Sequence, residues 1–174
     1  MQLSYNCHMI VLDSSTLILL SKIDMLGTFV SNLREKIVMP EKVKEETCLK
    51  GEAETPLIEK LIANHKILVI RLKNNKLAEK LMEDFHIDAG EAEAVALAFQ
   101  KKPSLVATDD RNAMRACKMM GIDFTTAIAV LIRAFEKNLV DKDDALIKLQ
   151  KLEGVARYSR RIIEDARNRI GGGD

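Results

Sequence analysis

The sequence predicts an α/β protein whose central parallel sheet of four to five strands is covered by helices. Short apolar runs recur at residues 9–12, 36–39, 67–70 and 104–107, with a weaker run at 122–124. Segments with helical periodicity separate these runs. Alternation of strands and helices is typical of parallel, doubly wound sheets.

The helical segments make the predicted fold helix-rich. Pro40 is well placed to begin a helix, and Gly121 to end one. Helices are expected near 14–34, with a break around Asp24, and near 40–49, 55–64, 74–86, 90–101, 110–120, 125–137, 142–152 and 158–170.

A length of 174 residues predicts a single domain over 1–174. Its core is expected at about 9–135 and its C-terminal helices at about 138–170. The glycine-rich tail 171–174 is expected to fray and to have no function.

Composition restricts the function classes. The net charge of +1 gives no overall basic field, so any binding of nucleic acid must depend on a local basic patch or on a metal ion. The three cysteines are odd in number and lack zinc-ligand spacing, as expected for reduced thiols. The sequence shows neither a signal peptide nor a membrane span. We therefore expect a soluble, cytoplasmic protein.

Acidic residues stand where predicted strands end or helices begin. Asp13 follows the first strand, and the pair Asp109 and Asp110 follows the strand at 104–107. Glu46 lies in the helix behind the second strand, and Glu91 opens an alanine-rich helix. The carboxyl ends of parallel strands form one edge, where ligands bind. Carboxylates that meet there repel one another unless a cation neutralises them.

Each acid also has a structural interpretation. Asp13 can cap the helix that follows it, and one of Asp109 and Asp110 can do the same. Glu91 has capping-box spacing from Asp88. The helix after Glu91 is apolar almost all round, however, and an inward carboxylate is costly unless it is paired or bound to metal. Together the acids predict a metal site, and without histidine or cysteine they favour Mg²⁺ or Mn²⁺.

At these residues the chain resembles the PIN-domain nucleases over roughly 9–135. Two of the matching pieces, Gly-Glu-Ala-Glu-Ala and Asp-Asp-Arg, are closest to a prokaryotic branch related to VapC-type toxins. The matching pieces are Ile10 to Ile18, Val38-Met39-Pro40 with Val43 and Glu46, Ala89 to Ala94, and Val106 to Arg111.

The resemblance implies a metal-dependent endoribonuclease on an α/β/α sandwich. It implies Asp13, Glu46, Glu91 and Asp110 as catalytic acids. The metal ligands are expected among Asp13, Glu91, Asp109 and Asp110, with Ser15 and Thr108 supporting the site. Asn112 replaces a further acid of many toxins, which weakens the expectation of a second metal.

The expected chemistry is hydrolysis of RNA with one or two Mg²⁺ or Mn²⁺ ions. An antitoxin on another chain and a homodimer are expectations from the resemblance alone. Four cationic residues near the acids or in the C-terminal stretch are the expected nucleic-acid contacts. Each of them can also be read as an ordinary solvent-exposed charge. They are Lys42, Arg111, Arg157 and Arg160.

Three other functions are weighed against the nuclease. A haloacid-dehalogenase-type phosphatase needs a second Asp two residues after its nucleophile, where this chain has Ser15. In a response-regulator receiver the acid pair comes before the phosphorylated Asp, whereas here it comes last. The remaining alternative is a PIN fold that binds RNA or protein without catalysis.

Overall fold

The computed structural model describes residues 3, 5, 7–48 and 52–172. Its five strands all pair in parallel, in the order β3-β2-β1-β4-β5. This arrangement confirms the predicted parallel sheet, including the weaker fifth strand. The strands are β1 (Met9–Leu12), β2 (Lys36–Pro40), β3 (Leu68–Ile70), β4 (Ser104–Ala107) and β5 (Asp123–Thr125).

The helices also follow the predicted pattern, with ends shifted by a few residues. The expected break near Asp24 separates the first two, because Asp24 adopts a left-handed backbone with φ 57°. The helices of the described residues are α1 (Ser14–Lys22), α2 (Leu26–Ser31), α3 (Glu41–Cys48), α4 (Thr55–Ala63), α5 (Lys76–Phe85), α6 (Ala89–Gln100), α7 (Arg111–Met120), α8 (Ala127–Glu136), α9 (Lys142–Val155) and α10 (Arg160–Gly171).

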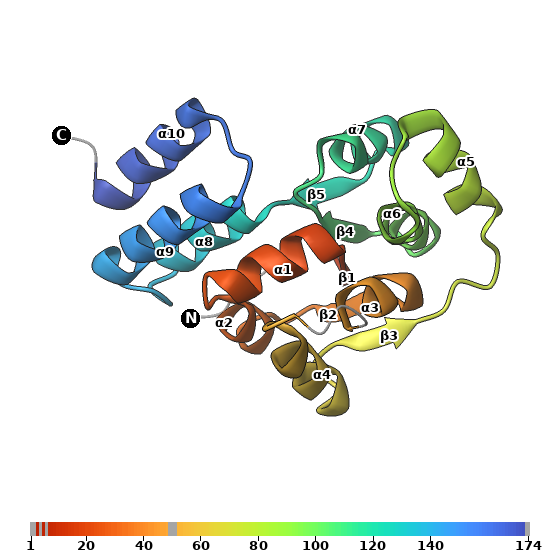
Figure 1. The fold of residues 1–174 in the computed structure, drawn as a ribbon, viewed down its shortest axis with the longest axis horizontal. Helices are drawn as coiled ribbons and strands as arrows, with labels where there is room; N and C mark the ends of the chain where they lie inside the picture. Colours follow the sequence, from red (N-terminus) through yellow and green to blue (C-terminus); the bar gives the residue numbers. More distant parts are fainter. Residues whose placement is uncertain (1–2, 4, 6, 49–51, 173–174) are drawn as a thin grey trace.

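Helices cover the sheet on both faces and form an α/β/α sandwich (Figure 1). Side chains of a strand point alternately to the two faces. In β1, Ile10 and Leu12 join the core beneath α1, α2 and α8, whereas Val11 joins the core beneath α5, α6 and α7. The central strands are therefore buried on both sides, as parallel sheets require.

Strand β3 differs from the prediction of a buried strand. It begins at Leu68, which is 39% exposed, and none of its three residues is fully buried. The reason is its place at one edge of the sheet, where it pairs only with β2.

Strand register fixes which residues share the carboxyl edge. Leu12 lies opposite Ala107, and Ala107 lies opposite Thr125. One residue further along, Asp13 is therefore level with Thr108. On the other side Val11 lies opposite Val38, so Asp13 is also level with Pro40. Pro40 in turn pairs with Ile70, the last residue of β3.

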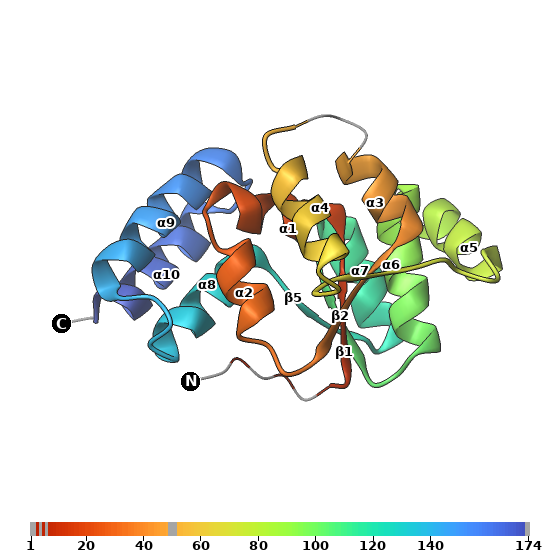
Figure 2. The same ribbon diagram turned by 90° about the horizontal axis from the view of Figure 1, so that it is seen from below.

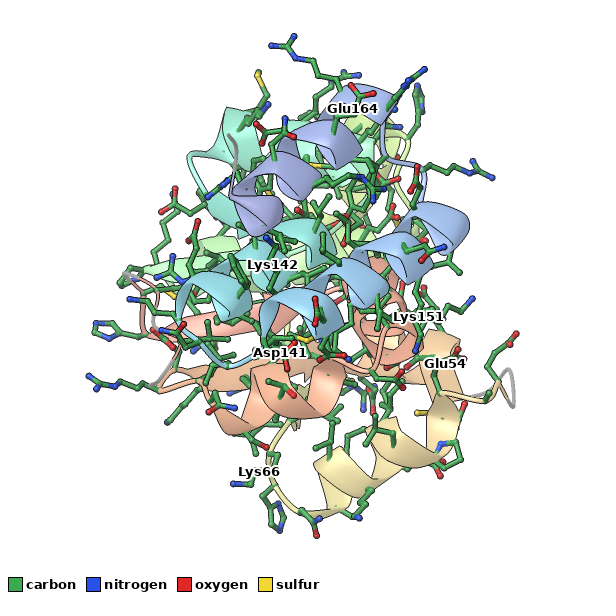
Figure 3. All side chains as sticks on the ribbon, turned by 90° about the vertical axis from the view of Figure 1, so that its left-hand side faces the viewer. Glu54, Lys66, Asp141, Lys142, Lys151 and Glu164 are labelled. Carbon is green, nitrogen blue, oxygen red and sulfur yellow. The ribbon has the colours of Figure 1, made fainter. Side chains whose placement is uncertain are left out.

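The last three helices form one end of the molecule, which Figure 3 views directly. α9 packs against α1, α8 and α10 and donates a buried hydrogen bond from Lys148 Nζ to the carbonyl of Ile23, 3.1 Å away. α10 continues through Gly171, and Gly172 ends it with φ 70°. The remainder of the predicted tail, 173–174, lies outside the described residues.

Within the described part of the chain, no helix is both long enough and apolar enough to cross a membrane.

Candidate metal centre

Asp13 is a fully buried carboxylate at the carboxyl end of β1. Its Oδ1 accepts a hydrogen bond from the Ser14 amide at 2.6 Å and caps α1. Its Oδ2 accepts from the Ser15 hydroxyl at 2.7 Å and from the Thr108 hydroxyl at 2.8 Å. Both Ser15 and Thr108 therefore hold the Asp13 carboxylate in place.

Burial raises the pKa of Asp13 to about 6, although the three donors oppose the rise. The negative charge of Asp88 adds to it. A buried carboxylate with nearby acids but without a cation partner is unfavourable in its charged form. The position of Asp13 therefore suits a cation ligand better than a simple helix cap.

Glu46 reaches this region from α3. Its Oε1 accepts a hydrogen bond from the backbone amide of Gly90, at the start of α6, at 3.1 Å. Gly90 is required by this contact, because a Cβ there would lie 2.3 Å from Glu46 Oε2. Burial, and then the charges of Asp88 and Asp13, raise the pKa of Glu46. Glu46 therefore lies close enough to Asp13 for the two charges to interact.

Glu91 takes part in the predicted capping box with Asp88. The Glu91 amide donates to Asp88 Oδ1 at 2.9 Å, and the Asp88 amide donates to Glu91 Oε2 at 3.0 Å. Desolvation nevertheless raises the pKa of Glu91 to about 8, and the charges of Asp13, Asp88 and Asp110 contribute. Glu91 therefore combines the structural role and the electrostatic position that the sequence suggested.

The pair Asp109 and Asp110 divides into two different roles. Asp109 Oδ2 accepts from the Thr16 hydroxyl at 2.5 Å and from the Ala127 amide at 3.0 Å. Its Oδ1 accepts from the Tyr158 hydroxyl. Both oxygens of Asp109 are thus engaged by α1, α8 and the α9–α10 connection, and burial raises its pKa.

Asp110 caps α7 and faces the other acids. Its Oδ1 accepts from the amides of Asn112 and Ala113, both at 2.8 Å. Unlike Asp109, Asp110 contributes to the raised pKa of Glu91. This difference favours Asp110 over Asp109 as the acid that joins the cluster.

The structure therefore brings together acids from four segments at one sheet edge. We call the set of Asp13, Glu46, Asp88, Glu91 and Asp110 the carboxylate cluster. In their present positions, no three histidine, cysteine or acidic side chains of the described residues form a closed metal site. Glu46 and Glu91 each accept a hydrogen bond from a backbone amide at the start of α6. The donor set fits a hard divalent cation, because all its members are carboxylates.

The sequence did not predict the roles of two residues at this site, Asp88 and Tyr158. Asp88 was assigned only a capping role, yet its charge acts on Asp13, Glu46 and Glu91. Tyr158 carried no signal, because it lies far from Asp109 in the sequence and belongs to no recognisable motif. The capping-box spacing already placed Asp88 beside Glu91, and this was the signal that could have added Asp88 to the acids of the site.

The predicted nucleic-acid contacts are all solvent-exposed or half-buried, but two of them have anionic partners. Lys42 Nζ lies 3.0 Å from Glu45, and Arg160 Nε lies 2.7 Å from Glu164. Arg111 follows Asp110 directly and is exposed at the start of α7. Arg157 is exposed in the connection between α9 and α10, directly before Tyr158, whose hydroxyl donates to Asp109.

A family model described as a PIN domain matches residues 9–171 of the chain. The chain belongs to the PIN-domain family, as the order of its acidic motifs predicted. PIN domains are generally nucleases that act on nucleic acids, typically with divalent metal ions. No curated protein sequence matches the chain.

Proposed function

We propose that this protein is a metal-dependent endoribonuclease that uses Asp13, Glu46, Glu91 and Asp110 as its catalytic acids. The observation that carries the proposal is the carboxylate cluster at the carboxyl edge of the sheet, where burial, and then repulsion from neighbouring acids, raises the pKa of Asp13, Glu46 and Glu91. Such mutual repulsion is relieved by a divalent cation. The raised pKa of Glu91 also means that cation binding at neutral pH releases a proton.

Asp13, Glu91 and Asp110 are our proposed ligands for one or two Mg²⁺ or Mn²⁺ ions. The three hydrogen bonds to Asp109 support a different role for that residue, which was also a candidate ligand. It would anchor the β4–α7 turn and hold Asp110 in place. A bound divalent ion supplies the Lewis acidity that activates water for in-line attack and neutralises charge on the leaving oxygen.

The chain's own residues orient these ligands. Ser15 and Thr108 fix Asp13 Oδ2, and the Asp109 amide donates to Ser15 Oγ at 3.0 Å. Glu46 is held in place by its hydrogen bond from the Gly90 amide. In this position Glu46 can accept a proton from an attacking water, because burial and neighbouring charges raise its pKa.

A more specific proposal is that the protein is the toxin of a toxin–antitoxin pair, acting in the cytoplasm and neutralised by a partner protein. It rests on the Gly-Glu-Ala-Glu-Ala and Asp-Asp-Arg motifs. Expression in a bacterial host tests it. A toxin stops growth, and the Asp13→Asn variant at equal abundance does not.

A non-catalytic binding module is the second candidate. The observation that favours it is the capping of backbone amides by both Glu46 and Glu91, which gives each acid a structural purpose. In this case the variants Asp13→Asn and Glu91→Gln would leave RNA binding unchanged, and no cleavage would occur with any metal.

The direct test is cleavage of a pool of single-stranded and structured RNAs with Mg²⁺ or Mn²⁺. We expect cleavage to require metal and to fall by at least about 100-fold in Asp13→Asn and Glu91→Gln. Asp143→Asn, an exposed acid on α9, is the matched control and should retain full activity. Equal activity in all four proteins would remove the carboxylate cluster from the mechanism.

A further inference from the structure

We propose that the connection between β3 and α5 binds the phosphodiester backbone of the RNA substrate and leads it to the carboxylate cluster. We call residues Arg71 to Lys76 the basic loop. The inference rests on the proposed nuclease function for its direction, but it concerns a separate surface. The first observation is that these six residues line a hollow of about 830 Å³.

The basic loop lies at the same sheet edge as the cluster. Its first residue, Arg71, directly follows Ile70, which pairs with Pro40, and Pro40 is level with Asp13. Neighbouring strands lie about 4.8 Å apart, and β3 is two strands from β1. The start of the loop is therefore roughly 10 Å from Asp13 along the edge. A strand of nucleic acid that occupies the hollow is directed toward the acids.

The side chains that line the hollow carry positive charges that are exposed to solvent. Arg71, Lys73 and Lys76 are all exposed, and Arg71 is 85% exposed. Within the described residues only Glu41 opposes them, at 3.5 Å from Arg71, and Lys73 and Lys76 pair with no acid. A chain with a net charge of +1 has little general attraction for RNA, so such a local patch decides where a strand binds.

The loop is attached to the core by one residue and has one local hydrogen bond. Leu72 is 8% exposed and anchors the loop in the core beneath α5 and α6. Asn74 Oδ1 accepts a hydrogen bond from the Lys76 amide at 3.0 Å, and both Asn74 and Asn75 are exposed. The side chains of Asn74 and Asn75 add hydrogen-bond donors between the cations. Amide donors and cations together match the oxygens of successive phosphates and sugars.

The arginines of α10 are the competing surface, and they are less suited. Three of the four arginines of α10 lie within 3.1 Å of a glutamate, which offsets part of their charge; they are Arg160, Arg167 and Arg169. The helix lies at the opposite end of the molecule from the basic loop, as Figures 1 and 2 show. Repulsion between the cluster and a phosphate chain is offset more directly by cations on the same sheet edge.

The test compares two triple variants with equal loss of charge. One is Arg71→Gln/Lys73→Gln/Lys76→Gln in the basic loop. The other is Lys36→Gln/Lys66→Gln/Lys101→Gln, three exposed lysines near the amino ends of β2, β3 and β4. Lys66, labelled in Figure 3, extends away from the protein there. Binding of a fluorescent single-stranded RNA is measured by anisotropy in EDTA, where cleavage cannot occur.

We expect the loop variant to bind roughly tenfold more weakly than the wild type, and its dependence of log K on log[salt] to flatten by about 2. The amino-end variant should bind like the wild type. Equal loss in both variants, loss in neither, or no binding by the wild type would each overturn the proposal.

Metal-dependent cleavage, measured in parallel, separates this inference from the proposed function. Cleavage that is unaffected in the loop variant leaves the nuclease intact and refutes the basic loop as its RNA site. Loop-dependent binding without cleavage supports the RNA site and refutes the nuclease.

Discussion

At the scale of single residues, the central feature is a buried aspartate that has hydrogen-bond donors but, among the residues that the structure describes, no cationic side chain paired with it. Asp13 accepts four hydrogen bonds, yet burial still raises its pKa to about 6. A residue retained for stability alone would not need its charge. Function and stability are therefore expected to respond in opposite directions when that charge is removed.

We predict that Asp13→Asn abolishes cleavage while leaving metal-free stability unchanged or raising it by about 1 kcal/mol at pH 8. The reason is that asparagine removes a buried charge and keeps one oxygen acceptor, while its NH2 group can donate to the Ser15 and Thr108 hydroxyls that now donate to Oδ2. Urea unfolding in EDTA measures the effect. A clear loss of stability would mean that Asp13 serves mainly as a structural cap.

A second residue-scale prediction concerns Gly90. In Gly90→Ala the new Cβ would meet Glu46 Oε2 at 2.3 Å, so the Glu46 side chain must leave its position. We expect cleavage to fall at least about tenfold, with little change in the free energy of unfolding. Gly154→Ala in α9 is the control, because nothing lies within 4 Å of its Cβ. That variant should gain about 0.5–1 kcal/mol of stability and keep full activity.

At the scale of secondary-structure elements, the start of α6 links helix capping to the carboxylate cluster. The ordinary pKa of a glutamate is 4.5, and in the folded protein that of Glu91 is about 8. The folded state therefore holds a proton on Glu91 that the unfolded state has lost over this pH range. Stability falls as pH rises wherever the folded state binds more protons than the unfolded state.

We accordingly predict that the metal-free protein loses stability as the pH rises from 4.5 to 8. In Glu91→Gln this loss should be smaller, because the group no longer titrates. Mn²⁺ should reverse the trend and stabilise the wild type more at pH 8 than at pH 6, since binding requires deprotonated ligands. Thermal unfolding at several pH values measures all three. A wild-type stability that rises with pH in EDTA would contradict the assigned electrostatics.

The connection between α9 and α10 is the second element that matters. The Tyr158 hydroxyl donates to Asp109 and accepts from the Ile128 amide at 3.2 Å. It thereby ties the C-terminal helices to the turn that carries Asp110. Removing one partner of such a buried network leaves polar groups unsatisfied, at a cost of about 1–3 kcal/mol.

We predict that Tyr158→Phe lowers the free energy of unfolding by about 1–3 kcal/mol and weakens Mn²⁺ binding, because Asp110 is less firmly placed. Chemical unfolding and a metal titration under folded conditions measure the two effects separately. Unchanged Mn²⁺ affinity in a folded Tyr158→Phe protein would show that the C-terminal helices do not support the site.

At the scale of the whole molecule, the sequence predicted the architecture because its apolar runs and helix signals agree. Buried strands such as β1 and β4 are nearly continuous apolar runs, and the end of α7 is marked by Gly121 in a left-handed conformation. The exposure of β3 was not predicted, because an edge strand and a central strand have the same local composition. Which strand lies at the edge depends on crossover connections.

The candidate site was predictable for a similar reason. Strand-end acids converge in any parallel sheet, so Asp13 and the Asp109–Asp110 pair could be brought together from topology alone. The different environments of Asp109 and Asp110 could not, because they depend on α8 and Tyr158, which are distant in sequence. The basic loop was not predicted from the sequence. Its place beside the carboxylate cluster depends on the register of β3 and not on a pattern in its own residues.

The central claim is that the carboxylate cluster binds a divalent metal ion. Calorimetric titration of Mn²⁺ into the wild type and into Glu91→Gln at pH 7, in buffers of different ionisation heat, tests it most directly. We predict that the wild type binds Mn²⁺ and releases protons, and that Glu91→Gln binds at least about tenfold more weakly and releases fewer. Absence of binding by the wild type, or equal affinity and equal proton release in both proteins, would contradict the account.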